Sequence, residues 1–367
     1  MTESRRAFRE LLELLDRIDT QYIGEPGEHK SALDVADGHR LVLHGLQRAL
    51  GSQLEADTRR PAFRRAITPA MKFGGDSPDA IYHECNVSAD CSYRIRGNMA
   101  GAVYVSLSVQ SGSSEAEGVG ASINSEQFDI QADGSFEIQL SRTPPADTRN
   151  WVQIPAGALN VLTRHYFEEA GNVMVDASRQ PELKISVLDD FPAPGEPTIE
   201  SVTAGIDRVA RWLRSRTLEE SKGRTTMPSW VSIVPNHFNE PEKPSEGMAY
   251  AALDIAYAMA PFHVPPGKAL VMSGRFPACR YAGVVLWSRF RQSFDYTSRQ
   301  VSLNRAQTVA DDAGNYRIVL AGRDPGVANW LDTGGRESGM MYWRFLLPEE
   351  PIAAPQCRLV DIDSLRA

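Results

Sequence analysis

The feature that most constrains the fold is a repeat, because a stretch of the first half of the chain recurs in the second half. Residues 132–151, ADGSFEIQLSRTPPADTRNW, align with residues 312–330, DAGNYRIVLAGRDPGVANW. Both stretches place alternating apolar residues after a Gly, and both end in Asn-Trp. Upstream, YRIRG (93–97) aligns with LVMSG (270–274). Self-similarity of this kind predicts two copies of one structural unit.

The hydrophobic pattern shows which kind of unit is repeated. From about residue 63 onward, short segments such as SYRIRG (92–97) and SFEIQL (135–140) alternate apolar and polar residues between Gly, Asn and Ser clusters. AVYVSLSV (102–109) and AGVVLWSR (282–289) are β-rich, and we align them as counterparts. Short strands at this spacing are typical of sandwiches and barrels. The expected fold is mainly β with helical additions (α+β), built as two jelly-roll-like β-sandwich units from an internal duplication.

Changes of pattern divide the chain into four segments. Residues 1–62 form an N-terminal helical segment, with Phe8, Leu11, Leu12, Leu15 and Ile18 at helical spacing. Residues 63–190 form the first β-sandwich unit. Residues 191–262, which open with the Pro-rich FPAPGEPT, form a linker with helices and a long polar loop, and residues 263–367 form the second unit. Within the linker we expect an Ala-rich helix near 248–260, and the loop at 223–247 is either a binding loop or disordered.

Charge and hydropathy limit the partners. The formal net charge is -8 and no Lys/Arg block is present, so nucleic acid and anionic membranes are not expected partners. The charged start and the absence of a stretch of about 20 apolar residues favour a cytoplasmic protein. The expected partner is a small-molecule substrate, and a homo-oligomer is possible.

The repeated Asn-Trp pairs, Asn150–Trp151 and Asn329–Trp330, have two interpretations. In the first, Asn stabilises a turn through backbone hydrogen bonds, and Trp closes the end of a sandwich. In the second, Trp is a stacking platform for a sugar or another flat ligand. We favour the structural interpretation, because two copies of a corner are commoner than two copies of one binding site.

These elements together resemble a known group of bacterial proteins. GDSPDAIY (75–82), SYRIRG, RQVSLN (299–304) and the Asn-Trp pairs are similar to the domain of unknown function 1214, often found beside the related domain 1254. The resemblance extends over most of the chain beyond residue 63, although this chain has Ser77 where the usual pattern has Asn. It implies paired jelly-roll-like domains with helical additions, and it implies no particular reaction.

The stretch GGDSPDAIYHECN (74–86) is the first candidate for chemistry. Its Gly and Pro residues are typical of a turn, and Asp76 can bond the nearby backbone. Asp79, Tyr82 and Glu84 follow, and Tyr82 and Glu84 share one face if the segment is a strand. If that face lines a cavity, Asp76 and Asp79 are candidate catalytic acids or bases, Tyr82 a catalytic partner and Glu84 a substrate ligand.

A metal is an open alternative at the same loop. Asp76 and Asp79 could supply hard oxygen ligands to Mg²⁺ or Ca²⁺, although the spacing is common. Fingerprints for nucleotide, nicotinamide, zinc-protease or serine-hydrolase sites are missing from the sequence. We therefore expect no organic cofactor and no dedicated metal site.

Basic residues on neighbouring strands extend the candidate site. Arg94 and Arg96 share a strand face, which is either solvated or placed to pair with Asp76 or Asp79 or to clamp an anionic substrate. His165 is a candidate general base if it lies beside the acidic loop, although an isolated histidine is more often structural.

The second copy lacks a counterpart of the acidic loop, because PPGKALVMSG (265–274) carries no carboxylate. It has instead Arg299, Asn304 and Arg305, and the preceding loop offers Asn236 and His237. These five residues are candidate substrate ligands, since a duplicated scaffold commonly uses one copy, or the interface between copies, for its site.

The sequence thus supports two functions. The first is a cofactor-independent acid/base enzyme, a hydrolase or lyase, that acts on a carbohydrate-like or other hydroxylated small organic substrate in a cleft of the duplicated scaffold. The second is a non-catalytic small-ligand-binding or scaffold protein. An Mg-dependent enzyme that uses Asp76 and Asp79 as ligands is a further alternative.

Overall fold

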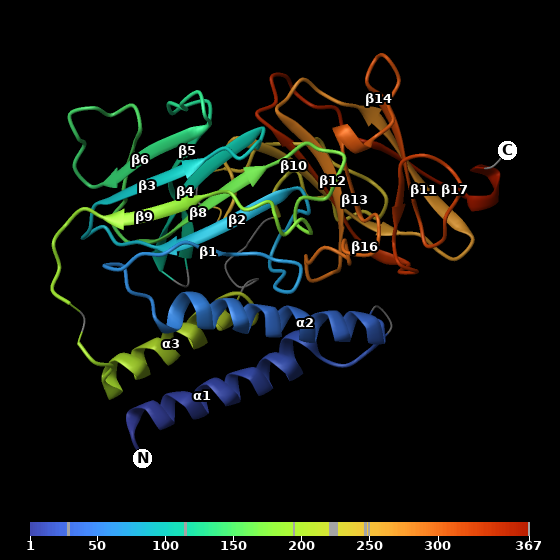
Figure 1. The fold of residues 1–367 in the computed structure, drawn as a ribbon. Coiled ribbons are helices and arrows are strands. Elements are labelled where there is room, and N and C mark those ends of the chain that lie inside the picture. The colour runs from blue at the N-terminus through green and yellow to red at the C-terminus, as the bar shows by residue number, and fades with distance from the viewer. Residues whose placement is uncertain are drawn as a thin grey trace.

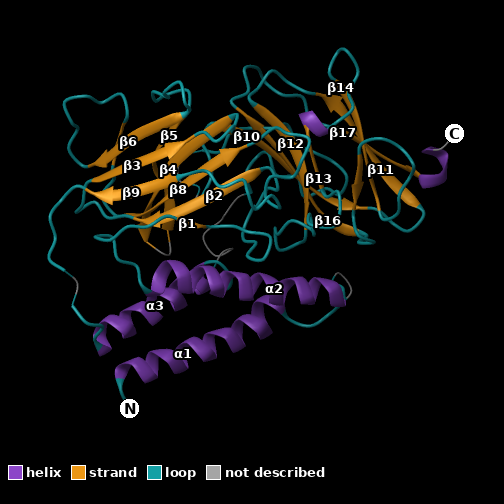
Figure 2. Cartoon of the chain, viewed as in Figure 1, coloured by secondary structure: helices purple, strands orange, loops and turns teal. Residues whose placement is uncertain are grey.

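The computed structural model describes residues 1–27, 30–113, 116–193, 195–219, 227–245, 248 and 250–365. Three α-helices lie together on one side of a large β-region (Figures 1 and 2). They are α1 (Glu3–Ile18), α2 (Ala32–Ala49) and α3 (Ile199–Ser215), with short π-helical turns at Asp19–Ile23 and Leu50–Leu54 and 3-10 turns at Arg305–Gln307 and Ile362–Leu365.

The first unit consists of two sheets. Its inner sheet has the order β1-β2-β8-β4-β5, and its outer sheet has the order β7-β6-β3-β9. The strands are β1 (Arg64–Arg65), β2 (Ala80–Asn86), β3 (Tyr93–Asn98), β4 (Tyr104–Ser113), β5 (Ala116–Asn124), β6 (Ser135–Ser141), β7 (Trp151–Gln153), β8 (Ala158–Tyr166) and β9 (Leu183–Val187).

The second unit repeats this arrangement strand by strand. Its inner sheet has the order β10-β16-β12-β13, and its outer sheet has the order β15-β14-β11-β17. The strands are β10 (Ile255–His263), β11 (Lys268–Arg275), β12 (Tyr281–Trp287), β13 (Ser302–Asn304), β14 (Asn315–Ala321), β15 (Trp330–Asp332), β16 (Ser338–Leu346) and β17 (Gln356–Asp361). Thus β2 to β9 correspond in order to β10 to β17, and the fold is mainly β in two similar halves, as the repeat predicted.

Pairing registers give the correspondence residue by residue. Gly97 pairs with Phe136 in the first unit, and Gly274 pairs with Tyr316 in the second. The alignment of YRIRG with LVMSG is therefore correct in register. The alignment of AVYVSLSV with AGVVLWSR is wrong by three residues, because Tyr104 occupies the position of Tyr281. Jelly-roll connectivity stays a prediction.

The four sheets form successive layers, with the two inner sheets facing each other (Figure 1). Along β2, Ile81 and His83 face the outer sheet of their own unit, whereas Tyr82 and Glu84 face away from it, as expected for a strand. One continuous apolar core runs through both units. The faces of the inner sheets that look toward each other carry polar and aromatic side chains, and the site lies between them.

The Ala-rich helix expected near 248–260 is wrong. Residues Ile255–His263 form strand β10, which pairs with β16 over its whole length and lies partly inside the expected linker. Ala256, Ala258 and Ala260 alternate with larger residues, so the small side chains share one sheet face. Ala favours helices in isolation, but pairing and packing in the sheet outweigh that preference.

The helical segment was predicted correctly, and of the apolar residues at helical spacing in its first helix Leu11 and Ile18 are buried. In α1, Ala7, Leu11, Leu14 and Ile18 are buried, whereas Phe8 and Leu12 are 52% and 42% exposed. The α1 helix packs mainly on α3, forming a separate apolar cluster with Val209, Trp212 and Leu213. Helix α2 contacts the β-region, where Gly38 meets Phe290 and Gly45 meets Phe73. No helix of the described residues is long and apolar enough to cross a membrane.

Candidate functional site

A cavity of about 400 Å³ lies between the two inner sheets, on the side where α2 and α3 approach them. The loop after α3 and the segment before β10 complete its wall. Its principal lining residues are Arg48, Phe73, Gly75, Tyr82, Arg164, Tyr166, Arg216, Trp230, Met248, Tyr250, Tyr257, Trp287, Arg291, Tyr342 and Arg344. Five of the lining residues are arginines, and none of the described lining residues is Asp or Glu. The described lining is therefore rich in cationic side chains.

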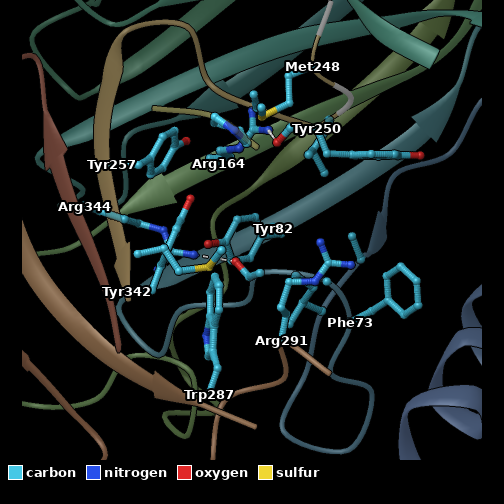
Figure 3. Close-up of a pocket in the computed structure, with 18 of the residues that line it drawn as sticks. Phe73, Tyr82, Arg164, Met248, Tyr250, Tyr257, Trp287, Arg291, Tyr342 and Arg344 are labelled. Atoms are coloured by element: carbon cyan, nitrogen blue, oxygen red, sulfur yellow. Dashed lines mark hydrogen bonds between the residues drawn. The ribbon is translucent and has the colours of Figure 1, made fainter. Parts of the chain in front are cut away.

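Aromatic rings form the wall on the second unit's side (Figure 3). Tyr342 stacks on Trp287 with ring centroids 4.2 Å apart and on Tyr257 with centroids 5.3 Å apart. Trp230 extends the row, with its centroid 5.4 Å from that of Tyr257. Such a wall offers a flat apolar surface on which a planar ligand body can stack.

Arg164 and Arg344 occupy equivalent positions in the two units. Arg164 on β8 pairs with Tyr82 on β2, and Arg344 on β16 pairs with Tyr257 on β10. Because β2 and β8 correspond to β10 and β16, the repeat brings one Tyr–Arg pair from each unit to the same cavity (Figure 3). Each arginine residue is only 4% exposed.

The hydrogen bonds of these two arginines within the described residues go to neutral groups. Arg164 donates to Ser108 Oγ at 2.9 Å and to the Tyr250 carbonyl at 2.8 Å. Arg344 donates from Nη2 to the carbonyls of Gly75, at 2.5 Å, and Asp76, at 3.5 Å. A guanidinium has five N–H donors, so each retains donors for a ligand.

Arg344 stays charged in this setting. Burial alone would lower its pKa, but Tyr166, Tyr82, Tyr342 and Tyr257 around it hold the pKa above its ordinary value. Its guanidinium also lies over the Tyr342 and Trp287 rings, 4.5 and 5.2 Å from their centroids. Cation–π contacts of this kind stabilise a desolvated guanidinium.

Arg48 of α2 differs, because its charge is balanced. Its Nη2 lies 2.5 Å from Glu84 Oε2, and both residues are buried. Burial would raise the pKa of Glu84, but the nearby Arg48 and Arg64 lower it. Glu84, a predicted substrate ligand, is thus the partner that places Arg48 at the cavity wall.

The stretch GGDSPDAIYHECN reaches the cavity through Gly74, Gly75 and Tyr82 rather than through its carboxylates. Gly74 and Gly75 have positive φ angles, 45° and 96°, which let the chain turn below the Trp287 ring. The carbonyls of Gly75 and Asp76 accept the hydrogen bonds from Arg344. Asp76 Oδ1 accepts a hydrogen bond from the Ser293 backbone N–H at 2.8 Å, and its Oδ2 accepts one from the Ser293 hydroxyl.

Asp79 is buried against the other unit. Its Oδ2 accepts a hydrogen bond from Tyr281 at 2.8 Å. Burial raises the pKa of Asp79 to about 7, although hydrogen bonds from Tyr281 and Asn304 oppose the rise. Neither Asp76 nor Asp79 lines the cavity, so a role as catalytic acid or base has no direct path to a ligand there.

The second unit does have a counterpart of Asp79, contrary to expectation. Asp254 precedes β10 as Asp79 precedes β2, and its Oδ2 accepts hydrogen bonds from Tyr104 and Asn124, both at 2.6 Å. Tyr104 and Asn124 occupy the positions of Tyr281 and Asn304. Two reciprocal Asp–Tyr–Asn clusters therefore join the units. This repeated placement favours a structural role for Asp79 and Asn304.

Tyr82 is the one predicted catalytic residue that lines the cavity. Its hydroxyl lies 3.3 Å from that of Tyr166, and burial raises its pKa well above the ordinary value. His165 faces the interior of the first sandwich instead, 6.4 Å from the His83 ring, and burial lowers its pKa to about 3. His165 is therefore not among the residues that line the cavity.

The remaining candidates lie outside the cavity lining. Arg94 and Arg96 both pair with Glu137 on the outer sheet, not with Asp76 or Asp79. Arg299 pairs with Asp332 at 2.7 Å and Arg305 with Glu168 at 2.6 Å. Asn236 binds the backbone at His263, and His237 is exposed.

The polar loop at 223–247 is only partly described. Residues 223–226 and 246–247 lie outside the described residues. Within 227–245, Met227, Pro228, Trp230 and Val231 line the cavity, and bridges at Val231 and Glu242 hold this part along β10. This part forms a wall of the cavity.

The two Asn-Trp pairs make the same contacts in both units. Asn150 bonds the backbone of Asp129 and Glu137, and Asn329 bonds that of Val309 and Arg317. Trp151 and Trp330 are half-buried, and neither lines the cavity. These contacts favour a structural role over a stacking platform.

The described residues include no group of three or more His, Cys, Asp or Glu side chains placed to hold a metal ion. The alternative Mg²⁺ or Ca²⁺ site at Asp76 and Asp79 therefore gains no third protein ligand from these residue types.

Comparison with known proteins gives the following matches. The chain is 25% identical to an uncharacterized protein from Burkholderia cenocepacia whose crystal structure superposes with a TM-score of 0.83, covering 98% of this chain and 97% of the other. The VPA0106 protein from Vibrio parahaemolyticus shares the fold at 10% identity and a TM-score of 0.52, covering 88% and 98%. No curated protein matches the chain. Residues 83–169, which lie within the first unit, match the family described as a protein of unknown function, DUF1214.

Proposed function

We propose that this protein binds a small organic anion with a flat, apolar body in the cavity between its two units. The observation that carries the proposal is the pair of buried arginines, Arg164 and Arg344, whose hydrogen bonds go to neutral groups. Enclosing a guanidinium costs several kcal/mol unless an anion compensates it. A carboxylate or similar group accepts paired hydrogen bonds from the guanidinium fork.

The aromatic wall supports the proposal that the ligand has a flat, apolar body. Tyr257, Tyr342 and Trp287 form a stack beside Arg344, so a planar body can lie on rings while its charge meets the guanidinium. The volume of about 400 Å³ falls in the range of small-molecule sites. This ligand differs from the carbohydrate-like substrate that the sequence suggested.

Titration calorimetry with benzoate, naphthoate and their neutral amides tests the proposal. We expect the acids to bind and the amides to bind at least about 10-fold more weakly, since a charge-assisted hydrogen bond contributes about 1.5–3 kcal/mol. Arg164→Gln and Arg344→Gln should weaken acid binding, whereas Arg96→Gln, on the outer sheet, should leave it unchanged. Equal affinity for acids and amides would contradict the proposal.

A second candidate is the cofactor-independent hydrolase or lyase. The pair Tyr82–Tyr166, with hydroxyls 3.3 Å apart at the cavity, favours it. Because the pKa of Tyr82 is raised, Tyr82 would act as a proton donor rather than a base. If the protein turns over a bound acid, Tyr82→Phe should lower kcat by about 10²-fold with little change in affinity. A non-catalytic binding protein would show no turnover of any ligand that it binds.

A further inference from the structure

The repeat gives the cavity two equivalent cationic positions. These two positions define the ligand more closely than a general preference for anions does. Arg164 and Arg344 are related by the correspondence of β8 and β16, and each comes from the inner sheet of a different unit. They therefore reach one cavity from the sheets of two different units rather than from one strand (Figure 3).

The hydrogen bonds of the two guanidinium groups hold them to different parts of the wall. Arg164 is tied to Ser108 and to Tyr250, at the side where α3 and the segment before β10 approach. Arg344 is tied to the carbonyls of Gly75 and Asp76 and lies over Trp287 and Tyr342. These hydrogen bonds hold each guanidinium group at its own place in the wall.

Two cations held separately at one cavity, with stacked aromatic rings beside Arg344, match a ligand that carries charge at two points. We propose that the ligand is a dianionic organic acid with a rigid, flat body, whose one anionic group pairs with Arg164 and whose other pairs with Arg344. This inference rests on the proposed function, because it specifies the ligand of the same cavity. A monoanion would leave one buried guanidinium without a counter-charge, which is the costly arrangement.

Matched diacids and monoacids separate this inference from the proposal on which it rests. The probes are the three benzenedicarboxylates and naphthalene-2,6-dicarboxylate, each compared with its monoamide, in titration calorimetry against the full chain. We expect the best diacid to bind about 10- to 100-fold more tightly than its monoamide, the usual contribution of one charge-assisted hydrogen-bonded pair. The preference should depend on the spacing of the two carboxylates.

Variants at the two arginines assign the contacts. Arg164→Gln and Arg344→Gln should each reduce the preference for the diacid to less than about 3-fold, while binding of the monoamide falls in only one of them. Arg164→Lys and Arg344→Lys keep the charge at each position and should retain part of the preference, which guards against a Gln variant that folds poorly. Arg96→Gln is the matched control and should bind as the parent protein does.

Three results are distinguishable. Tighter diacid binding that needs both arginines supports the inference. Equal binding of diacid and monoamide, with both arginines needed for either, overturns it and keeps the proposed function, because the two cations would then share one anionic group. Failure of every acid to bind more tightly than its neutral amide overturns both.

Discussion

Tyr281 donates a hydrogen bond to Asp79 Oδ2 over 2.8 Å, although the two residues belong to different units. The same contact recurs in reverse between Tyr104 and Asp254. Each unit therefore supplies one acceptor and one donor to the interface. None of these four residues lines the cavity, so the two contacts join the inner sheets without occupying ligand space.

Asp79→Asn should change how stability depends on pH. The pKa of Asp79 is raised from 3.8 to about 7 in the folded protein, so the folded state binds a proton that the unfolded state has lost. This contribution to stability is complete below about pH 4 and is lost as the pH rises through about 7. At its steepest it amounts to about 1.4 kcal/mol per pH unit.

Asn resembles the protonated acid and accepts the same hydrogen bond from Tyr281, so the variant should lose less stability than the parent between pH 4 and 7. Chemical unfolding at intervals across this range measures the difference. Identical pH dependence in the two proteins would show that Asp79 is ionised throughout. The cavity should bind its acids normally in this variant.

Glu84→Gln should lower stability and strengthen anion binding. Glu84 compensates the buried Arg48, with Nη2 and Oε2 2.5 Å apart, so removing its charge leaves a buried cation at the cavity wall. Breaking a buried pair costs about 3–5 kcal/mol, and the loss of a carboxylate makes the cavity wall more positive, which favours an anionic ligand. Denaturant unfolding and calorimetry measure the two effects.

Glu137→Gln is the matched control for this change. Glu137 pairs with Arg94 and Arg96, but its side chain is 49% exposed. Exposed pairs contribute about 0–1 kcal/mol, and this one lies on the outer sheet. A similar loss of stability in both variants would argue against a buried charge pair at Glu84.

Asn150→Ala and Asn329→Ala should both destabilise the protein, Asn329→Ala by more, and leave ligand binding intact. Each side chain bonds the backbone of two neighbouring segments, so its removal should cost about 2–3 kcal/mol. Asn329 has a φ of 57°, so Ala there carries an added strain that Gly relieves. Comparing Asn329→Gly with Asn329→Ala separates the two causes in denaturant unfolding. A loss of affinity in either variant would restore the stacking interpretation of the corner.

Leu14→Asp and Leu12→Asp should differ sharply. Leu14 is 1% exposed between α1 and its neighbours, whereas Leu12 is 42% exposed. A charge at Leu14 should cost about 3 kcal/mol or more, and one at Leu12 should cost little. Melting temperatures decide the matter, and equal losses would mean that both faces of α1 are covered.

The repeat was readable because sheet register preserves spacing, and so Gly97 and Gly274 could be aligned directly. The site was harder to read, since its residues come from separate strands and are brought together only by packing of the units. Arg164 and Arg344 were not chosen as site residues. The signal lay in LTRHY (162–166) and YWRFL (342–346), where Arg holds the same position in corresponding strands, but this is visible only after the strands are aligned.

The acidic loop illustrates the opposite error. A cluster of carboxylates near a turn is typical of a site, and no local property of the sequence shows that Asp76 and Asp79 find partners in the second unit. Asp76 accepts hydrogen bonds from Ser293 and Asp79 Oδ2 accepts one from Tyr281, and both donors lie more than two hundred positions away in the chain. Sequence patterns describe the residues that a segment contains. Long-range pairing decides which of those residues can still contact a ligand.

The correspondence of the two units has a consequence for what the cavity can distinguish. In a symmetric homodimer, a pocket on the twofold axis must present every side chain twice, so it treats the two ends of a ligand alike. Here Leu162 stands where the other unit has Tyr342, and Glu84 stands where it has Met259. Joining both halves in one chain lets each wall change independently, so the two ends of a bound molecule can meet different side chains in this pocket.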